Sequence, residues 1–162
     1  YFAFIQNHCG PFPGPQYCFL ILIGLKTLHV RMLRHCENGE KIAQWLKQNP
    51  KVDKVLWCGF EEHPNHAIAK KQMRGYGGMM SFTLKDDNID AAFKVLSTTR
   101  LFALAESLGG VESLIGHPAS MTHASIPREE RLKTGLVDSL IRLSVGIEDA
   151  DDLIADLNNA IG

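Results

Sequence analysis

The stretch Leu140-Ile141-Arg142-Leu143-Ser144-Val145 decides the fold of this 162-residue chain. Successive side chains of a β-strand point to opposite faces, so the apolar residues at positions 141, 143 and 145 share one face. Arg142 and Ser144 share the other face. The pattern predicts a strand that is buried on one face, with the Arg142 guanidinium on the face that helices leave uncovered.

Outside this strand, the hydrophobic pattern alternates between helical and extended segments. Apolar residues at three-and-four spacing predict one long helix at about 24–48. Further strands are expected at 52–57, 80–84 and 101–105, further helices at 15–23, 66–73, 88–96, 127–133 and 148–160, and irregular structure at 106–126. The sum is an α/β fold, in which a long helix precedes a small sheet of about four strands with helices on one face.

The composition is that of an ordinary globular protein, with 45% hydrophobic and 22% charged residues. The 17 basic and 18 acidic residues give a net charge of −1, which removes the electrostatic case for binding nucleic acid or an anionic membrane. The four cysteines form no Cys-x-x-Cys pair and are too few for a disulfide framework. Reduced thiols in a cytoplasmic protein are therefore expected.

The chain begins with the apolar residues Tyr1-Phe2-Ala3-Phe4-Ile5, without Met and without the basic residues of a secretory signal. Residues 6–17 contain five glycines or prolines, Pro11 among them, which predict a loop or a helix entry. The longest unbroken apolar run, residues 17–23, is too short to span a bilayer. We expect no membrane anchor, and we expect that the start is a cut into a longer chain or the product of processing.

Two features qualify as parts of a binding site. A guanidinium such as that of Arg142 can hold a carboxylate through two parallel hydrogen bonds, although a solvated arginine on an open strand face is the more common situation. The string Glu106-Ser107-Leu108-Gly109-Gly110 directly follows a predicted strand, and its glycines allow close approach of the backbone. An ordinary turn is the more common explanation of such a string, so the residues alone favour a turn over a binding site.

No metal site is expected from the histidines. His63 and His66 bracket a proline, and no cysteine or carboxylate stands nearby at a spacing typical of zinc ligands. His117 and His123 are expected to order the irregular segment through hydrogen bonds. The glycine-rich residues 75–78 precede a strand rather than a helix, so they predict a turn and not a phosphate-binding loop.

Six strings, found in the family's order over essentially the whole chain, resemble the C-terminal part of the cystathionine γ-synthase and γ-lyase family of pyridoxal-phosphate enzymes. The strings are Gly24-Leu25-Lys26-Thr27-Leu28, Arg34-His35-Cys36-Glu37-Asn38, Gly77-Gly78-Met79, the residues 106–115, the residues 118–124, and the residues 140–149. The resemblance implies the C-terminal domain of a fold type I enzyme with a mainly antiparallel sheet. Residues 1–48 would be the linker segment and long helix toward a large cofactor domain, and residues 49–162 the small α/β domain.

The resemblance also implies roles for four residues. Arg142 would bind the α-carboxylate of the substrate, and Ser107 would be the catalytic-site serine beside the cofactor lysine. Glu106 would lie near the distal amino group of cystathionine; β-lyases carry an aromatic residue and methionine γ-lyases an apolar residue at this position. Thr122 would support the carboxylate site.

Pyridoxal phosphate is the cofactor that the resemblance implies, but its anchor is not in this sequence. The family's Schiff-base lysine lies in a Ser-x-Thr-Lys-Tyr segment, and the chain contains no such segment. No residue of this chain is therefore assigned to cofactor binding, and the chain alone is expected to be inactive.

The function expected for the longer protein is transsulfuration on a small amino-acid substrate. Cystathionine γ-synthase, which replaces the acyl group of an activated homoserine by cysteine, is the first expectation, and cystathionine γ-lyase is the alternative. Full-length relatives are tetramers, so a homo-oligomer is expected. A stand-alone binding or assembly module without chemistry is the competing hypothesis.

Overall fold

The computed structural model describes residues 1–10 and 12–162. The chain divides into two compact units, residues 1–31 and residues 32–162. Pro11, one of the residues that predict a loop, lies outside the described residues.

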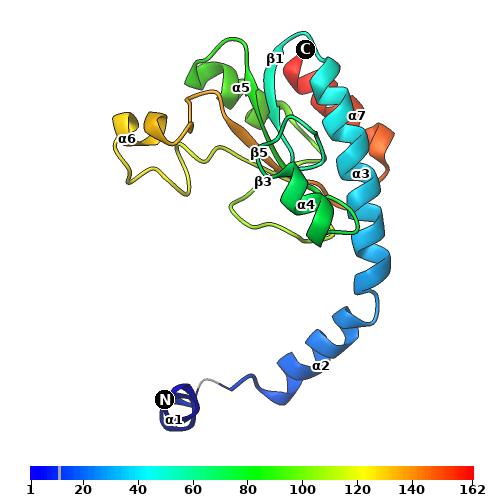
Figure 1. Cartoon of the computed structure of the whole chain (residues 1–162), viewed down its shortest axis with the longest axis vertical. Helices are drawn as coiled ribbons and strands as arrows, with labels where there is room; N and C mark the ends of the chain where they lie inside the picture. The colour runs from blue at the N-terminus through cyan, green and yellow to red at the C-terminus, as the bar shows by residue number, and fades with distance from the viewer. Residues whose placement is uncertain (11) are drawn as a thin grey trace. The chain divides into compact units, whose positions relative to one another are not determined.

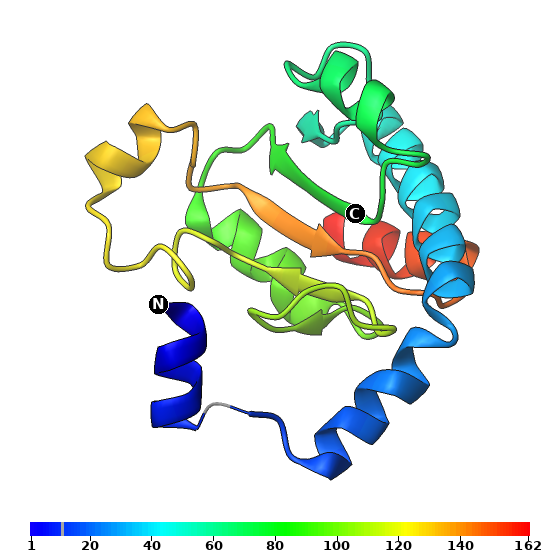
Figure 2. The same cartoon turned by 60° about the horizontal axis from the view of Figure 1, so that its bottom comes forward.

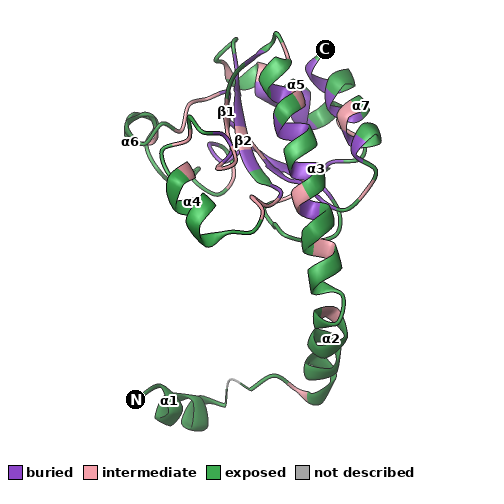
Figure 3. Ribbon diagram, turned by 45° about the vertical axis from the view of Figure 1, so that its right-hand side comes forward, coloured by how far each residue is buried: buried purple, intermediate pink, exposed green. Residues whose placement is uncertain are grey.

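The first unit is helical and apolar. Helix α1 spans Phe2–Cys9 and ends at Gly10, which adopts a left-handed conformation with φ of 67°. The expected loop at 6–17 is therefore wrong for residues 6–9, which belong to α1. Helix α2 spans Pro15–Leu25, with Pro15 in its first turn as predicted, and neither helix contains a buried residue (Figure 3).

Helix α3 spans Leu28–Gln48. The helix expected at 24–48 is thus interrupted at Lys26 and Thr27, where α2 ends. Within the described residues, no single helix is long and apolar enough to cross a membrane; α2 and α3 together meet the length and composition criteria, but a bend of 56° separates them. The C-terminal half of α3 buries Ile42 and Leu46 completely.

A five-stranded sheet forms the second unit, in the order β1-β2-β5-β4-β3. The strands are β1 (Val52–Leu56), β2 (Met79–Leu84), β3 (Ala103–Leu104), β4 (Leu114–Gly116) and β5 (Ile141–Ser144). All neighbours are antiparallel except β3 and β4, which pair in parallel. The prediction of about four strands missed β4, which lies inside the segment expected to be irregular. Figure 2 shows β5, in orange, between β2 and β4.

The remaining helices are α4 (His66–Gln72), α5 (Ile89–Thr98), α6 (Arg128–Lys133) and α7 (Ala150–Ile161). Asn88 caps α5 as predicted, because its side chain accepts a hydrogen bond from the Ala91 N–H. The acidic start of α7 is likewise capped by Asp149.

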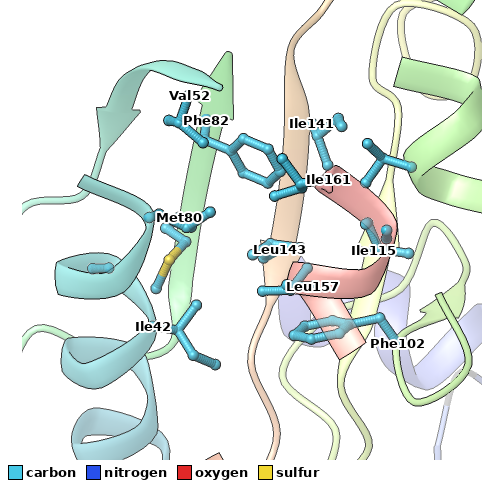
Figure 4. Packing of buried hydrophobic residues seen from close by; sticks show 14 of the residues in the cluster. Ile42, Val52, Met80, Phe82, Phe102, Ile115, Ile141, Leu143, Leu157 and Ile161 are labelled. Carbon is cyan, nitrogen blue, oxygen red and sulfur yellow. The ribbon is translucent and has the colours of Figure 1, made fainter. Parts of the chain in front are cut away.

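The core lies between one face of the sheet and helices α3, α5 and α7 (Figure 1). Ile141 and Leu143 of the central strand are fully buried there beside Phe82 and Leu157 (Figure 4). Burial of each such side chain stabilises the fold by about 1.5–3 kcal/mol. The α/β fold with its mainly antiparallel sheet and helices on one face is confirmed.

Buried polar side chains of α3 fix the turn that follows β5. His35 Nδ1 donates to the Val145 carbonyl at 2.7 Å, and Asn38 Nδ2 donates to the carbonyls of Gly146 and Glu148 at 3.1 and 2.7 Å. These contacts join the end of the central strand to the long helix, so the position of β5 is set from two sides.

Candidate functional site

Strand β5 places Arg142 on the face of the sheet opposite the core. Its backbone neighbours across the ladder are Ser81 in β2 and Gly116 in β4. The flanking residues Ile141 and Leu143 point into the core and are fully buried, so the alternation of the strand fixes the direction of the arginine.

The guanidinium of Arg142 contacts the loop that follows β3. Its Nη2 atom donates to the Glu106 carbonyl at 2.8 Å and to the Ser107 carbonyl at 3.3 Å. The Nε and Nη1 groups make no hydrogen bond to any residue that the structure describes. The arginine is half-buried, so these donors remain available to a ligand.

A shallow, open hollow lies beside Arg142; its space of about 150 Å³ includes open solvent, and it encloses no room for a water molecule. It is lined by Ala105, Glu106, Gly116, His117, Pro118, Met121, Thr122 and Arg142. An arginine whose Nε and Nη1 groups are free suits a carboxylate, which accepts two parallel hydrogen bonds once Nη2 also turns to it.

The structure brings the four sequence-predicted residues to one place. Arg142, Glu106 and Thr122 line the hollow, and Ser107 takes part through its carbonyl oxygen. Glu106 and Ser107 are exposed, and the Thr122 Oγ1 atom lies 2.8 Å from His123 Nδ1.

The glycine end of the same loop is attached to Ser144, a residue that the sequence did not single out. The Gly109 N–H donates to the Ser144 Oγ at 2.8 Å, and Gly109 has a φ of 76°, which favours glycine. The sequence does contain a signal for Ser144, because the alternation of the strand puts it on the same face as Arg142.

His117 also lines the hollow. Its ring is fully buried, and Nε2 donates to the Asp138 carbonyl at 2.8 Å. The Nδ1 atom lies 2.8 Å from Ser120 Oγ, within hydrogen-bond distance. The predicted ordering of this segment by His117 is confirmed.

Asp138 also forms an ion pair with Arg128. The Arg128 Nε atom donates to the Asp138 carboxylate at 2.7 Å. This hydrogen bond raises the pKa of the Arg128 guanidinium above its ordinary value. The contacts of His117 and Arg128 with Asp138 therefore connect the hollow to helix α6.

Other hollows lie away from these residues. One of about 420 Å³ runs beside β1, and one of about 660 Å³ lies between α5 and the end of α7. Neither contains any of the four predicted site residues. In the part of the chain that the structure describes, no group of three or more His, Cys, Asp or Glu side chains is placed to hold a metal ion.

The chain is similar to a known family of proteins. Residues 1–162 match the model of the family described as Cys/Met metabolism PLP-dependent enzyme. The chain is 56% identical over 158 residues to a cystathionine gamma-lyase of Dictyostelium discoideum and, again at 56%, to a cystathionine beta-lyase of Coxiella burnetii. Each match covers 98% of this chain and 41% of the relative. An L-methionine gamma-lyase of Fusobacterium nucleatum subsp. polymorphum is 45% identical over 99% of this chain and 40% of that protein. The chain thus spans about two fifths of the length of the curated relatives it matches.

Proposed function

Because the chain belongs to the Cys/Met metabolism PLP-dependent enzyme family, we propose that it supplies the substrate-binding part of a lyase that cleaves cystathionine by γ-elimination. The single observation that carries this proposal is the Arg142 fork in a hollow that Glu106 also lines. A fork binds the α-carboxylate of an amino acid, and a nearby carboxylate attracts its distal ammonium group.

The choice of a lyase rests on the relatives. The sequence alone led to synthase as the first expectation, with γ-lyase as the alternative. The relatives reported above carry the names of lyases, which favours the alternative. Their names differ in the bond that is cleaved, so the choice of γ-elimination rests on the identity of Glu106, because the resemblance implies an aromatic residue at this position in β-lyases.

The family depends on pyridoxal phosphate, but the hollow at Arg142 does not fit this cofactor. None of the described residues that line it is a lysine, which the covalent attachment of this cofactor requires. The family cofactor supplies the electron-withdrawing chemistry of the reaction when it is bound. We assign to this chain the binding and orientation of the substrate, and no cofactor contact.

We propose that residues 1–48 join the small domain of residues 49–162 to the remaining length of the family. The apolar surface of α2 supports this proposal, because residues 1–25 contain no Asp, Glu, Lys or Arg and seven of the large apolar side chains of α2 are exposed. A helix that is apolar on all sides is normally buried in a larger structure. We likewise propose that the whole protein is a homo-oligomer.

The test is an assay of the whole protein with L-cystathionine alone and with an acyl-homoserine plus cysteine. γ-Elimination releases cysteine, 2-oxobutyrate and ammonia, whereas β-elimination releases homocysteine, pyruvate and ammonia. We expect the first set of products from L-cystathionine alone. Pyruvate and homocysteine, or turnover that requires the acyl-homoserine, would contradict the proposal.

A matched pair of variants tests the role of Glu106. Glu106→Gln should weaken the binding of L-cystathionine, because it removes the negative charge of a residue that lines the hollow. Glu112→Gln changes another exposed carboxylate shortly after this loop and should leave binding unchanged. Equal effects of the two substitutions would remove Glu106 from the site.

A further inference from the structure

We propose that Ser144 is the positioning residue that holds the loop 106–110 in place while a carboxylate occupies Arg142. This inference deepens the proposed function and rests on it for the identity of the substrate. It concerns how the loop that carries Glu106 and Ser107 keeps its position relative to the arginine.

The loop is attached to strand β5 at two points. Arg142 binds its first part through the carbonyls of Glu106 and Ser107, and Ser144 binds its last part through the Gly109 N–H. Ser144 is 2% exposed, so the strand shields its hydroxyl from water, while the donor Gly109 lies at the exposed surface.

A carboxylate ligand competes with the first attachment. The two parallel hydrogen bonds between an arginine and a carboxylate use either Nη1 and Nη2 or Nε and Nη2. Nη2 takes part in both arrangements, and in this structure Nη2 is bonded to the two loop carbonyls. A bidentate carboxylate therefore displaces at least one carbonyl, because a charged acceptor forms the stronger bond.

The second attachment has no such competitor. Gly109 donates to a neutral hydroxyl on the next outward position of the strand, and among the described residues Arg142 forms no hydrogen bond with that hydroxyl. When the carboxylate takes the Nη2 hydrogens, the Ser144 bond is the contact that keeps the loop beside the hollow. Loss of the Ser144 hydroxyl should therefore matter most in the liganded state.

The experiment uses the 162-residue chain, labelled with ¹⁵N, and sodium acetate as the carboxylate probe. The Arg142 Nε–H resonance reports the probe at the fork, and amide hydrogen exchange of Gly109 reports the loop. In Ser144→Ala, Gly109 should exchange about three- to tenfold faster than in the unchanged chain, and the difference should grow in acetate. Ser144→Cys keeps the volume with a weak acceptor and should give the same direction.

Ser139→Ala is the matched control. Ser139 is fully buried just before β5, but its hydroxyl donates to the Leu84 carbonyl at 3.4 Å and not to the loop. This variant should leave Gly109 exchange unchanged with and without acetate. A purely structural role of Ser144 would raise exchange throughout the sheet instead of in the loop.

Three results would overturn the inference: acetate that leaves the Arg142 Nε–H resonance unmoved, Gly109 exchange unchanged in Ser144→Ala, or a difference that acetate does not increase. A second titration uses L-cystathionine. If acetate gives the expected result and L-cystathionine does not bind, the positioning role of Ser144 stands and the proposed substrate is wrong.

Discussion

Gly116 lies directly opposite Arg142 in the β4–β5 pair, and it leaves the space through which the guanidinium reaches the loop after β3. A Cβ atom at position 116 would lie 3.9 Å from Arg142 Nη2 and 3.2 Å from the Ala105 carbonyl oxygen. An alanine side chain in β4 would therefore press on the Ala105 carbonyl, which directly precedes the Glu106 and Ser107 carbonyls that bind the arginine.

Gly116→Ala should weaken carboxylate binding more than it changes stability. The contact of 3.2 Å forces the Ala105 carbonyl to move, which destabilises the folded chain. Alanine also lowers the conformational entropy of the unfolded chain, which offsets part of this destabilisation. The free energy of unfolding should therefore change by less than about 1 kcal/mol. The affinity for acetate, followed at Arg142 Nε–H, should fall about three- to tenfold, the size of one hydrogen bond. Gly110→Ala, whose Cβ would make only an ordinary contact of 3.5 Å, is the control. Equal affinities in the two variants would show that Gly116 is not required for the reach of Arg142.

Arg142→Ala should lower kcat/KM of the whole protein for L-cystathionine. Loss of a charge-assisted, two-pronged contact costs about 2–4 kcal/mol, which corresponds to roughly 30- to 900-fold. Arg142→Lys should recover only part of this loss, because a lysine keeps the charge but not the planar fork. An unchanged kcat/KM in Arg142→Ala would exclude the proposed role in carboxylate binding.

The parts of the fold that the sequence predicts correctly are those with a regular apolar period. The alternation at 140–145 gives β5 and the uncovered face of Arg142, and the three-and-four spacing gives most of α3. Strand β4 was missed because it has three residues, ends in Gly116 and lies in a segment rich in small and polar groups. Helix α1 was missed because its apolar residues are exposed and have no amphipathic pattern to read.

For the site, the sequence identifies residues but not the hydrogen bonds between them. The strand pattern identifies Arg142, and the family resemblance adds Glu106, Ser107 and Thr122. The hydrogen bonds from Nη2 to the loop carbonyls depend on the absence of a side chain at Gly116, in a strand that the sequence pattern does not reveal. Backbone acceptors carry no sequence signature, so these contacts appear only when the strands are paired.

Cys58 should react with iodoacetamide more slowly than Cys9 and Cys18. Burial raises the pKa of the Cys58 thiol above its ordinary value, whereas Cys9 and Cys18 are exposed. A raised pKa leaves less thiolate at a given pH, and the thiolate is the reactive form. The difference in reaction rate between Cys58 and the two exposed cysteines should be largest near pH 8 and should narrow as the pH rises. It should disappear in the denatured chain. Peptide mass spectrometry over a pH series measures it, and a Cys58 midpoint at or below that of the exposed thiols would contradict the prediction.

Asp156→Ala should cause a large loss of stability in the second unit. The carboxylate of this α7 residue is 8% exposed and accepts hydrogen bonds from three consecutive backbone N–H groups, those of Arg100, Leu101 and Phe102, at 2.8–3.1 Å. These donors lie just before β3, so the contact also fixes the strand that leads into the loop 106–110. Removal of the acceptor leaves buried donors unpaired, and the expected cost is about 3–5 kcal/mol.

Urea denaturation of the chain, followed by circular dichroism, measures this cost. Asp156→Asn keeps one acceptor oxygen and should lose less stability than Asp156→Ala, because part of the three-donor contact survives. Asn158→Ala changes an exposed position of the same helix and should stay within about 0.5 kcal/mol of the unchanged chain. If Asp156→Ala is no more destabilised than Asn158→Ala, then the three N–H groups find other partners and α7 does not fix the start of β3.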